Sequence, residues 1–340
     1  MPPPPPLRAA LPRALRGLRL PVVAAPLFII SNPALVIAQC TAGVVGSFPA
    51  LNARSPAQLD EWLHEITEAL AAHDRAHPDR PAAPFAINQI VHKSNSRLES
   101  DLASAVKWRV PVTISSLGAR ADVNDAMHGV GGVVLHDVTN VAHARKAIDK
   151  GADGLVAVTA GAGGHAGSKH PFALLQEIRA WFAGPLLLSG AIATGRAVLA
   201  AQVAGADLAY VGSAFIATHE ARASDAYKAA VVQGTSDDIV GTPLFTGVFG
   251  NYLKVSVAAA GLDPERLPEP KPTAAADVFG AAAAGGGATS AKAWRDIWGC
   301  GQGIGAVDSV VGAGQLVERL TGEYAAAVHE VSHGVARARE

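Results

Sequence analysis

The sequence of 340 residues lacks most features that mark specialised protein classes. It has only two cysteines, Cys40 and Cys300, which are too far apart for a disulfide framework and have no metal-ligand spacing. Its formal net charge of −1 gives no electrostatic basis for binding nucleic acid or an anionic membrane surface. No apolar run of about 18 residues is free of glycine, proline and polar breaks, so we expect no transmembrane helix. These absences favour a cytoplasmic protein without nucleic-acid or membrane partners.

Several catalytic and targeting motifs are also missing. The proline run from Met1 to Pro6, which we expect to be extended or disordered, and the arginines after it are not followed by the apolar segment of a signal peptide. The candidate histidine, His165, has no second histidine at the i, i+4 spacing of a metal-binding helix, and we expect no metal site. No G-x-S-x-G sequence occurs near a candidate histidine, which argues against a serine hydrolase.

What the sequence has is a regular alternation of short apolar runs and helical stretches from Leu20 onward. Eight strands are predicted, at 21–24, 43–48, 85–91, 111–115, 132–136, 153–159, 185–189 and 207–211. Each is followed by a helical stretch, and this count predicts an α/β fold of the (β/α)8 TIM-barrel type. An open doubly wound sheet is the alternative, but the first strand–helix turn lacks a G-x-G-x-x-G sequence.

The alternation of predicted strands and helices ends after Glu220, and we place the predicted domain boundary there. Residues 1–19 form an N-terminal extension, 20–220 the barrel, and 221–305 a smaller C-terminal lid domain. The lid contains turn signals at 241–243, a proline-rich stretch at 264–272 and an Ala/Gly-rich stretch at 274–288. A final helix then returns, so that 306–330 completes the barrel.

A histidine lies in a glycine-rich segment just after the sixth predicted strand. The apolar run 154–158 predicts a buried strand, and Gly163, Gly164 and His165 follow it. Ligands bind at the carboxyl ends of parallel strands, and glycine lets the backbone approach them closely. Histidine exchanges protons near neutral pH, so His165 is the candidate catalytic residue. The alternative is an ordinary loop with a chance histidine.

Two later strands end in segments suited to a phosphate group. Ser189, Gly190 and Ala191 end the seventh strand, and Gly212 and Ser213 end the eighth. In barrels the backbone N–H groups at these positions commonly bind phosphate. Because Arg196 is the only basic residue close by, we expect a tightly held cofactor phosphate and not a transferred phosphoryl group. Alternatively, these glycines only relieve crowding at the strand ends.

Other strand ends offer contacts for a flat ring lying across the barrel mouth. Ala25, Pro26 and Leu27 follow the first strand with small and apolar side chains, and Asn88 could bond the edge of a heterocycle. Asp137 ends the fifth strand as a lone acid, a pattern that is more typical of a turn former than of a catalyst.

Further segments make one family resemblance specific. They run in order at 21–28, 32–33, 85–88, 163–167, 189–196, 205–207, 211–218, 245–254, 260–263 and 298–305. In this series the chain resembles the nitronate monooxygenases, formerly 2-nitropropane dioxygenases, which are FMN-dependent TIM-barrel flavoproteins. The match extends from residue 20 to residue 325, and the segment around Gln302 is similar to the family's late A-G-Q-G-x-G turn.

The resemblance implies a site for FMN. It implies that Gly190, Gly212 and Ser213 hold the phosphate and that the ring lies near the first strand end, Asn88 and Gly163. It makes His165 the active-site histidine, near the substrate nitro group and able to act as base for a neutral nitroalkane. Ser189, Ala191, Asp137, Gly164 and Gln302 complete the cofactor residues that we expect.

Two positions depart from the family pattern and bear on the substrate. Many relatives have a lysine where this chain has Asp137, and some have an acid in the segment that is Gly161-Ala162-Gly163 here. We therefore expect FMN-dependent oxidation of alkyl nitronates or nitroalkanes with O2 to a carbonyl compound and nitrite. NAD(P)H-dependent reduction of quinones or enoyl thioesters is the alternative, because the same barrel hosts it. A flavin-free barrel lyase or isomerase and a non-catalytic FMN-binding protein are further rivals. The oligomeric state is open, with a homodimer as the candidate.

Overall fold

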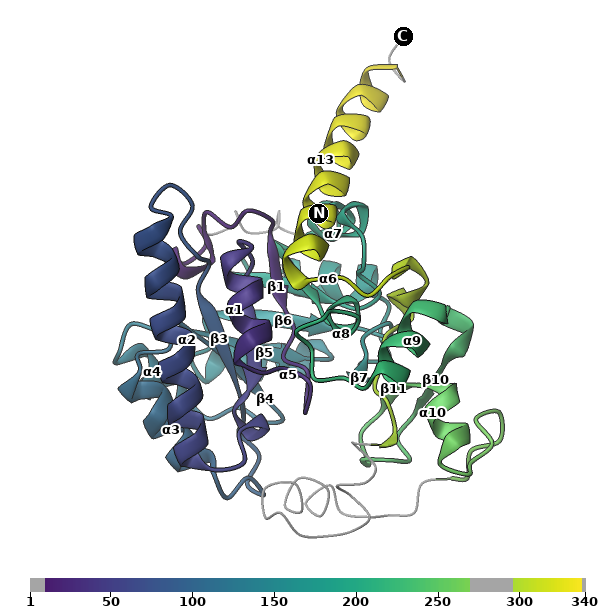
Figure 1. The fold of residues 1–340 in the computed structure, drawn as a ribbon, viewed down its shortest axis with the longest axis horizontal. Coiled ribbons are helices and arrows are strands. Elements are labelled where there is room, and N and C mark those ends of the chain that lie inside the picture. The colour runs from purple at the N-terminus through teal and green to yellow at the C-terminus, as the bar shows by residue number, and fades with distance from the viewer. Residues whose placement is uncertain (1–9, 270–295, 338–340) are drawn as a thin grey trace.

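The computed structural model describes residues 10–269 and 296–337. The expected proline run at 1–6 and the Ala/Gly-rich stretch at 274–288 lie outside these residues. The main body is a barrel of eight parallel strands (Figure 1). In chain order these are β1 Val22–Ala24, β2 Gly46–Pro49, β3 Phe85–Ile90, β4 Val112–Ser116, β5 Val133–Val138, β6 Gly154–Val158, β8 Leu186–Ser189 and β9 Leu208–Val211. The TIM-barrel fold predicted from the alternation is therefore confirmed, with every predicted strand within a few residues of its place.

Hydrogen bonds between the first two strands close the barrel. The sheet order is β1-β9-β8-β6-β5-β4-β3-β2, and a parallel bridge between Val23 and Val45 joins its two ends. Side chains alternate along each strand, so every second residue faces the barrel interior. The interior is filled by apolar side chains such as Leu135, Val156 and Leu187. Leu15 of the short helix η1, Arg13–Leu15, packs into this same cluster.

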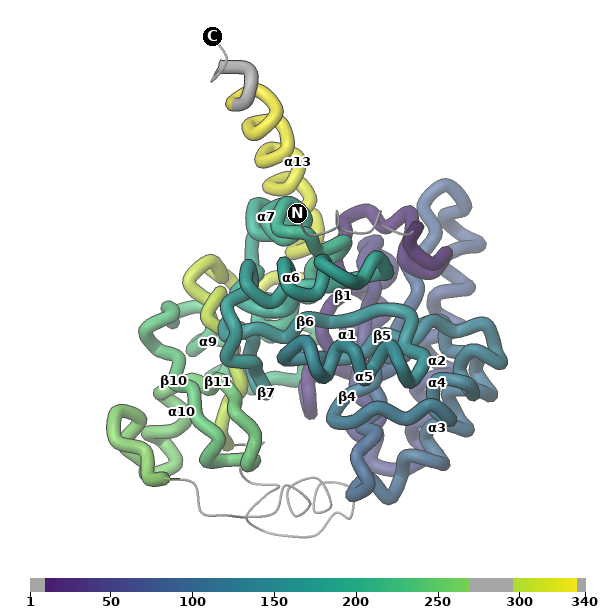
Figure 2. The backbone as a smooth tube through the Cα atoms, turned by 180° about the vertical axis from the view of Figure 1, so that it is seen from behind, coloured from purple at the N-terminus to yellow at the C-terminus, as the bar shows by residue number. Residues whose placement is uncertain are grey.

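Helices cover the outside of the barrel (Figure 2). The first of them begins at a capping signal of the sequence. Asn32 accepts hydrogen bonds from the backbone N–H groups of Ala34 and Leu35, and Pro33 occupies the first helical position. The barrel helices are α1 Pro33–Thr41, α2 Pro56–Ala76, α3 Leu98–Lys107, α4 Ala121–His128, α5 Val141–Asp149, α6 Pro171–Arg179, α7 Gly195–Val203 and α8 Ser213–Ile216.

A second, three-stranded sheet lies beside the barrel mouth. It contains β7 Gly164–His165, β11 Gly250–Leu253 and β10 Ile239–Thr242, in the order β10-β11-β7, with α9 Asp225–Gln233 and α10 Lys254–Ala259 nearby. The expectation that His165 lies in a loop is therefore wrong. Two residues are too few to show a strand pattern, and β7 exists because β11 pairs with it in antiparallel register, with Gly250 opposite His165.

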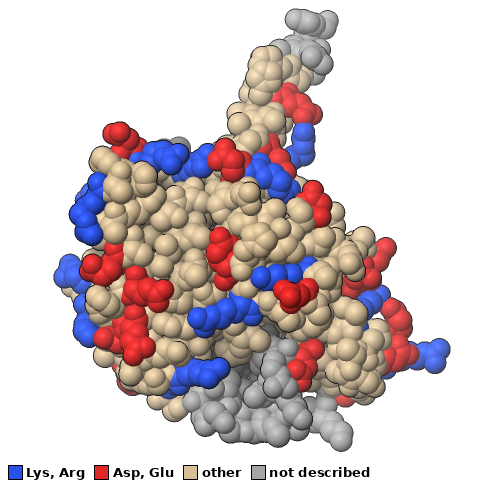
Figure 3. Space-filling view, viewed as in Figure 1, with Lys and Arg blue, Asp and Glu red and all other residues tan. Residues whose placement is uncertain are grey.

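The last helix, α13 Ala313–Arg337, packs against α7 and α1 and then projects away from the body (Figures 1 and 2). Gly195 allows the close approach, because a Cβ there would lie 2.1 Å from the carbonyl oxygen of Leu320. Acidic and basic side chains are interspersed over the face shown in Figure 3. No helix among the described residues is long and apolar enough to cross a membrane.

Candidate active site

A cavity of about 650 Å³ opens at the carboxyl ends of the barrel strands. Its size is typical of sites for small molecules and cofactors. Almost all the site residues predicted from the sequence line it: Ala25, Pro26, Leu27, Asn88, Asp137, Gly163, Gly164, His165, Ser189, Gly190, Ala191, Gly212 and Ser213. Gln302 is different, because its side chain is exposed while its neighbours Gly301 and Gly303 line the cavity. Its backbone N–H donates to the carbonyl oxygen of Gly161.

The backbone at one end of the cavity has the form that a phosphate site needs. Gly190 has φ +139°, and a Cβ there would lie 2.3 Å from Thr159 Oγ1, so the turn after β8 requires glycine. Ala191 follows in the left-handed region with φ +54°. At Gly212 a Cβ would meet only Ala25 and Leu27, at 3.5 and 3.6 Å, so the absence of a side chain there widens the cavity.

The hydrogen-bond donors at this end come from the backbone. No described residue accepts from the N–H groups of Gly212 and Ser213, which begin the single turn of α8. The Ser213 hydroxyl accepts a hydrogen bond of 2.8 Å from the N–H of Gly301 and contacts the Cys300 thiol. Arg196 is exposed and paired with Glu330 on α13. An anion bound here would therefore be held by backbone dipoles.

His165 also lines the cavity, from β7 of the smaller sheet. Its Nε2 atom is 3.0 Å from Oγ1 of Thr246, a buried side chain. The Thr246 hydroxyl donates to the carbonyl oxygen of Val248, so toward His165 it acts as an acceptor. This contact orients the imidazole ring in the cavity wall. Burial lowers the pKa of His165 to about 4, so the imidazole is neutral at pH 7.

A polar chain crosses the floor of the cavity. Asn88 Nδ2 donates to the Ile114 carbonyl oxygen at 2.9 Å and to Ser116 Oγ at 2.7 Å. The Ser116 hydroxyl donates in turn to Asp137 Oδ2 at 2.6 Å. The other carboxylate oxygen of Asp137 and the hydroxyl of Tyr210 are buried without a hydrogen-bond partner among the described residues. Asp137 is thus part of a network inside the barrel, and not a turn former at its rim.

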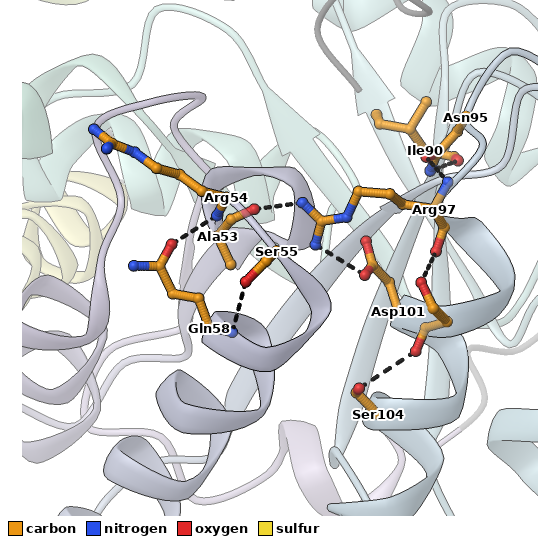
Figure 4. Close-up of polar contacts among 10 residues, drawn as sticks. Ala53, Arg54, Ser55, Gln58, Ile90, Asn95, Arg97, Asp101 and Ser104 are labelled. Carbon is orange, nitrogen blue, oxygen red and sulfur yellow. Dashed lines mark hydrogen bonds and ion pairs between the residues drawn. The ribbon is translucent and has the colours of Figure 1, made fainter. Parts of the chain in front are cut away.

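The loops on the β1–β3 side of the mouth are braced by polar side chains. Asn52 Nδ2 donates to the carbonyl oxygens of Leu27 and Ser31, which fixes the segment after β1. Arg97 donates to the Ala53 carbonyl oxygen and forms an ion pair of 2.9 Å with the buried Asp101 (Figure 4). These contacts hold the loops after β1, β2 and β3 in one arrangement.

Sequence reasoning missed three residues of the site. Tyr210 precedes Gly212 by two positions and therefore faces the same side of β9, a signal that strand alternation could have supplied. Ser116 ends β4, and nothing local indicates its bond to Asp137. Thr246 lies in a segment that resembles the family, but its contact with His165 depends on packing between positions 81 residues apart. Among residues 10–269 and 296–337, no group of three or more His, Cys, Asp or Glu side chains could hold a metal ion.

The fold and the site define an α/β-barrel enzyme with a cofactor pocket at the mouth of its strands. The sequence matches the nitronate monooxygenase family model over residues 12–323, so the chain belongs to this family. It is therefore an FMN-dependent oxidoreductase, as the sequence motifs predicted.

Individual relatives and solved structures agree with this membership. A nitronate monooxygenase from Paraburkholderia phytofirmans is 28% identical over 297 residues, covering 77% of this chain and 80% of the relative. A bicyclic carboxyl-CoA dehydrogenase from Mycobacterium tuberculosis is 27% identical over a match that covers 72% of this chain and 65% of the relative. FabK from Thermotoga maritima superposes with a TM-score of 0.74 at 22% sequence identity. The match covers 94% of this chain and 97% of FabK. Nitroalkane oxidase from Streptomyces ansochromogenes superposes with a TM-score of 0.70 at 23% sequence identity. The match covers 92% of this chain and 98% of the oxidase.

The residues present fit FMN. The N–H groups of Gly212 and Ser213, which have no acceptor among the described residues, suit the single phosphate of FMN. Because Gly212 has no side chain, the cavity has room for the phosphate there. The lining between this end and His165 is mainly apolar, with the Asn88–Ser116–Asp137 chain as a polar edge. When bound, FMN supplies the electron-transfer chemistry, and the protein supplies position and exclusion of water.

Proposed function

We propose that this protein oxidises alkyl nitronates, and the nitroalkanes from which they form, with O2 to a carbonyl compound and nitrite. Family membership supports the reaction class. The observation that carries the proposal is the position of His165. It lines the same cavity as the residues that fit FMN, and its Nε2 atom is held by Thr246.

In this proposal His165 takes the proton of a neutral nitroalkane. A neutral imidazole can accept a proton, and its low pKa means that the base form is present throughout the neutral range. The nitronate produced is an anion, and the imidazolium that has just formed is its nearest counter-charge. Thr246 holds the ring in position by its contact with Nε2.

We also propose that residues 221–305 act as a lid over the barrel formed by 20–220 and 306–330. The pairing of β11 with β7 supports this role, since it places a lid strand directly beside His165. The Asn251 side chain adds to it by donating to the carbonyl oxygens of Ala160 and Ala162 at 2.7 Å. The free thiols of Cys40 and Cys300 support a cytoplasmic location, where thiols stay reduced.

One experiment separates the proposed reaction from its alternative. The FMN-loaded protein is mixed without oxygen with a preformed nitronate, with NADH and with NADPH, and the flavin absorbance near 450 nm is followed. We expect nitronate to bleach the flavin and admission of O2 to restore it with release of nitrite. Rapid bleaching by NADH or NADPH with no response to nitronates would overturn the proposal in favour of a reductase.

A further inference from the structure

The floor of the cavity contains a buried carboxylic acid whose charge is poorly compensated. Asn88, Ser116, Asp137 and Tyr210 lie on β3, β4, β5 and β9 and all line the cavity. Below them the barrel interior is apolar. A carboxylate in such surroundings loses hydration that its partners must replace.

The hydrogen-bond directions leave one carboxyl oxygen of Asp137 unsatisfied. Ser116 Oγ receives a hydrogen from Asn88 and gives its own to Asp137 Oδ2, so Oδ2 is an acceptor. Within residues 10–269 and 296–337, the buried Oδ1 atom has no hydrogen-bond partner, and neither has the buried hydroxyl of Tyr210. Only the protonated acid has a hydrogen at Oδ1 that it could donate to an acceptor in the cavity.

Most of the groups around Asp137 are uncharged. Ser116 on β4 and Val156 and Val158 on β6 are neutral, and Tyr210 on β9 stays protonated because burial and the charge of Asp137 raise its pKa. His136 on β5 is the one neighbouring group that lowers the pKa of Asp137 by its charge. Its ring is held by backbone carbonyl oxygens, those of Asp137 itself and of Gly118.

Five more titratable groups line the cavity. His143 and Lys146 are exposed, His92 is half-buried, burial keeps Tyr227 protonated by raising its pKa, and His165 is neutral. Burial therefore dominates and raises the pKa of Asp137 to about 6.

We propose that Asp137 takes up one proton from solvent when FMN binds, so that cofactor affinity depends on pH through this carboxyl group. FMN brings a negatively charged phosphate and covers the cavity floor, and both changes disfavour a carboxylate. The ring carbonyl oxygens of FMN are hydrogen-bond acceptors. A protonated Oδ1 of Asp137 could donate a hydrogen bond to such an acceptor, whereas an ionised Oδ1 would repel it. The neutral acid is thus the form that binds FMN, and ionisation of Asp137 in the free protein competes with binding.

The test measures FMN affinity of the apoprotein between pH 5 and 8.5 by fluorescence quenching. For the natural protein we expect constant affinity below pH 6 and a fall of about tenfold per pH unit above it. The Asp137→Asn variant should lack this fall. The second ionisation of the FMN phosphate, with a pKa of about 6, affects both proteins equally, and riboflavin as ligand removes it.

Two further variants sharpen the comparison. Asp122→Asn makes the same chemical change on an exposed side chain of α4 outside the cavity, and it should keep the natural slope. Ser116→Ala removes the hydrogen bond that lowers the pKa of Asp137, so the fall in affinity should begin at a higher pH.

Proton counting provides a measurement that needs no variant. Calorimetry of riboflavin binding at pH 7.5, in two buffers of different ionisation enthalpy, should give uptake of about one proton. No proton uptake in this experiment, or the same pH slope in the natural protein and Asp137→Asn, would overturn the proposal. Neither result bears on whether nitronates are the substrate.

Discussion

The Oγ1 atom of Thr246 lies 3.0 Å from Nε2 of His165 and joins the segment after β10 to the wall of the barrel mouth. The threonine hydroxyl also donates to the carbonyl oxygen of Val248, so it is itself held in place. His165, the proposed base, is thus oriented by a residue from outside the barrel.

Thr246→Val removes the hydroxyl and nearly preserves the side-chain shape. We expect kcat/KM for a neutral nitroalkane to fall about tenfold, since leaving a buried polar group unpaired costs about 1–3 kcal/mol. FMN content should not change. Thr246→Ser keeps the acceptor and should restore most of the rate. If Val and Ser variants lose activity equally, packing and not the hydrogen bond explains the effect.

His165→Asn should retain the fold and the flavin while removing the base. Turnover of neutral nitroalkanes should then fall by about 10²–10⁴, the usual contribution of general base catalysis. Preformed nitronates need no deprotonation, so their turnover should fall much less. Steady-state kinetics on both substrate forms, normalised to flavin content, provide the measurement. Equal losses for the two forms would contradict the role of His165 as base.

Gly212 offers a matched pair of substitutions at the phosphate end of the cavity. A Cβ at this position makes only ordinary contacts with Ala25 and Leu27, so Gly212→Ala should fold and keep most of its FMN. Gly212→Asp places a carboxylate among N–H donors suited to an anion, and FMN occupancy should collapse. Flavin absorbance per protein and circular dichroism measure both outcomes. Full occupancy in a folded Asp variant would place the phosphate elsewhere.

Arg97 is the stabilising partner of a buried acid. Its side chain is 12% exposed and that of Asp101 is 0% exposed, so Arg97→Ala leaves an uncompensated buried carboxylate. We expect the free energy of unfolding to fall by about 3–5 kcal/mol, measured by urea denaturation. Arg54→Ala is the matched control, because Arg54 is exposed on the neighbouring loop (Figure 4), and it should change stability by less than about 0.5 kcal/mol. Similar values for both variants would show that the ion pair contributes little.

Much of the barrel could be predicted because its strands are buried on both faces. Such strands are short apolar runs between helices with clear first-turn signals, as at Gly154–Val158 and at Asn32-Pro33. The ends of parallel strands meet at one edge, so listing the residues that follow each strand already assembled most of the cavity lining.

Other features depend on contacts between distant segments and left no local pattern. The sequence by itself determined the barrel, the family and the set of strand-end residues, because burial and turn chemistry act over a few neighbouring positions. Only the tertiary structure decided that His165 lies in a strand paired with β11, that Thr246 orients its ring, and that Asp137 is buried beside Ser116 with one oxygen unsatisfied. These features arise from packing between segments far apart in the chain, and the electrostatic environment of a side chain is set by that packing.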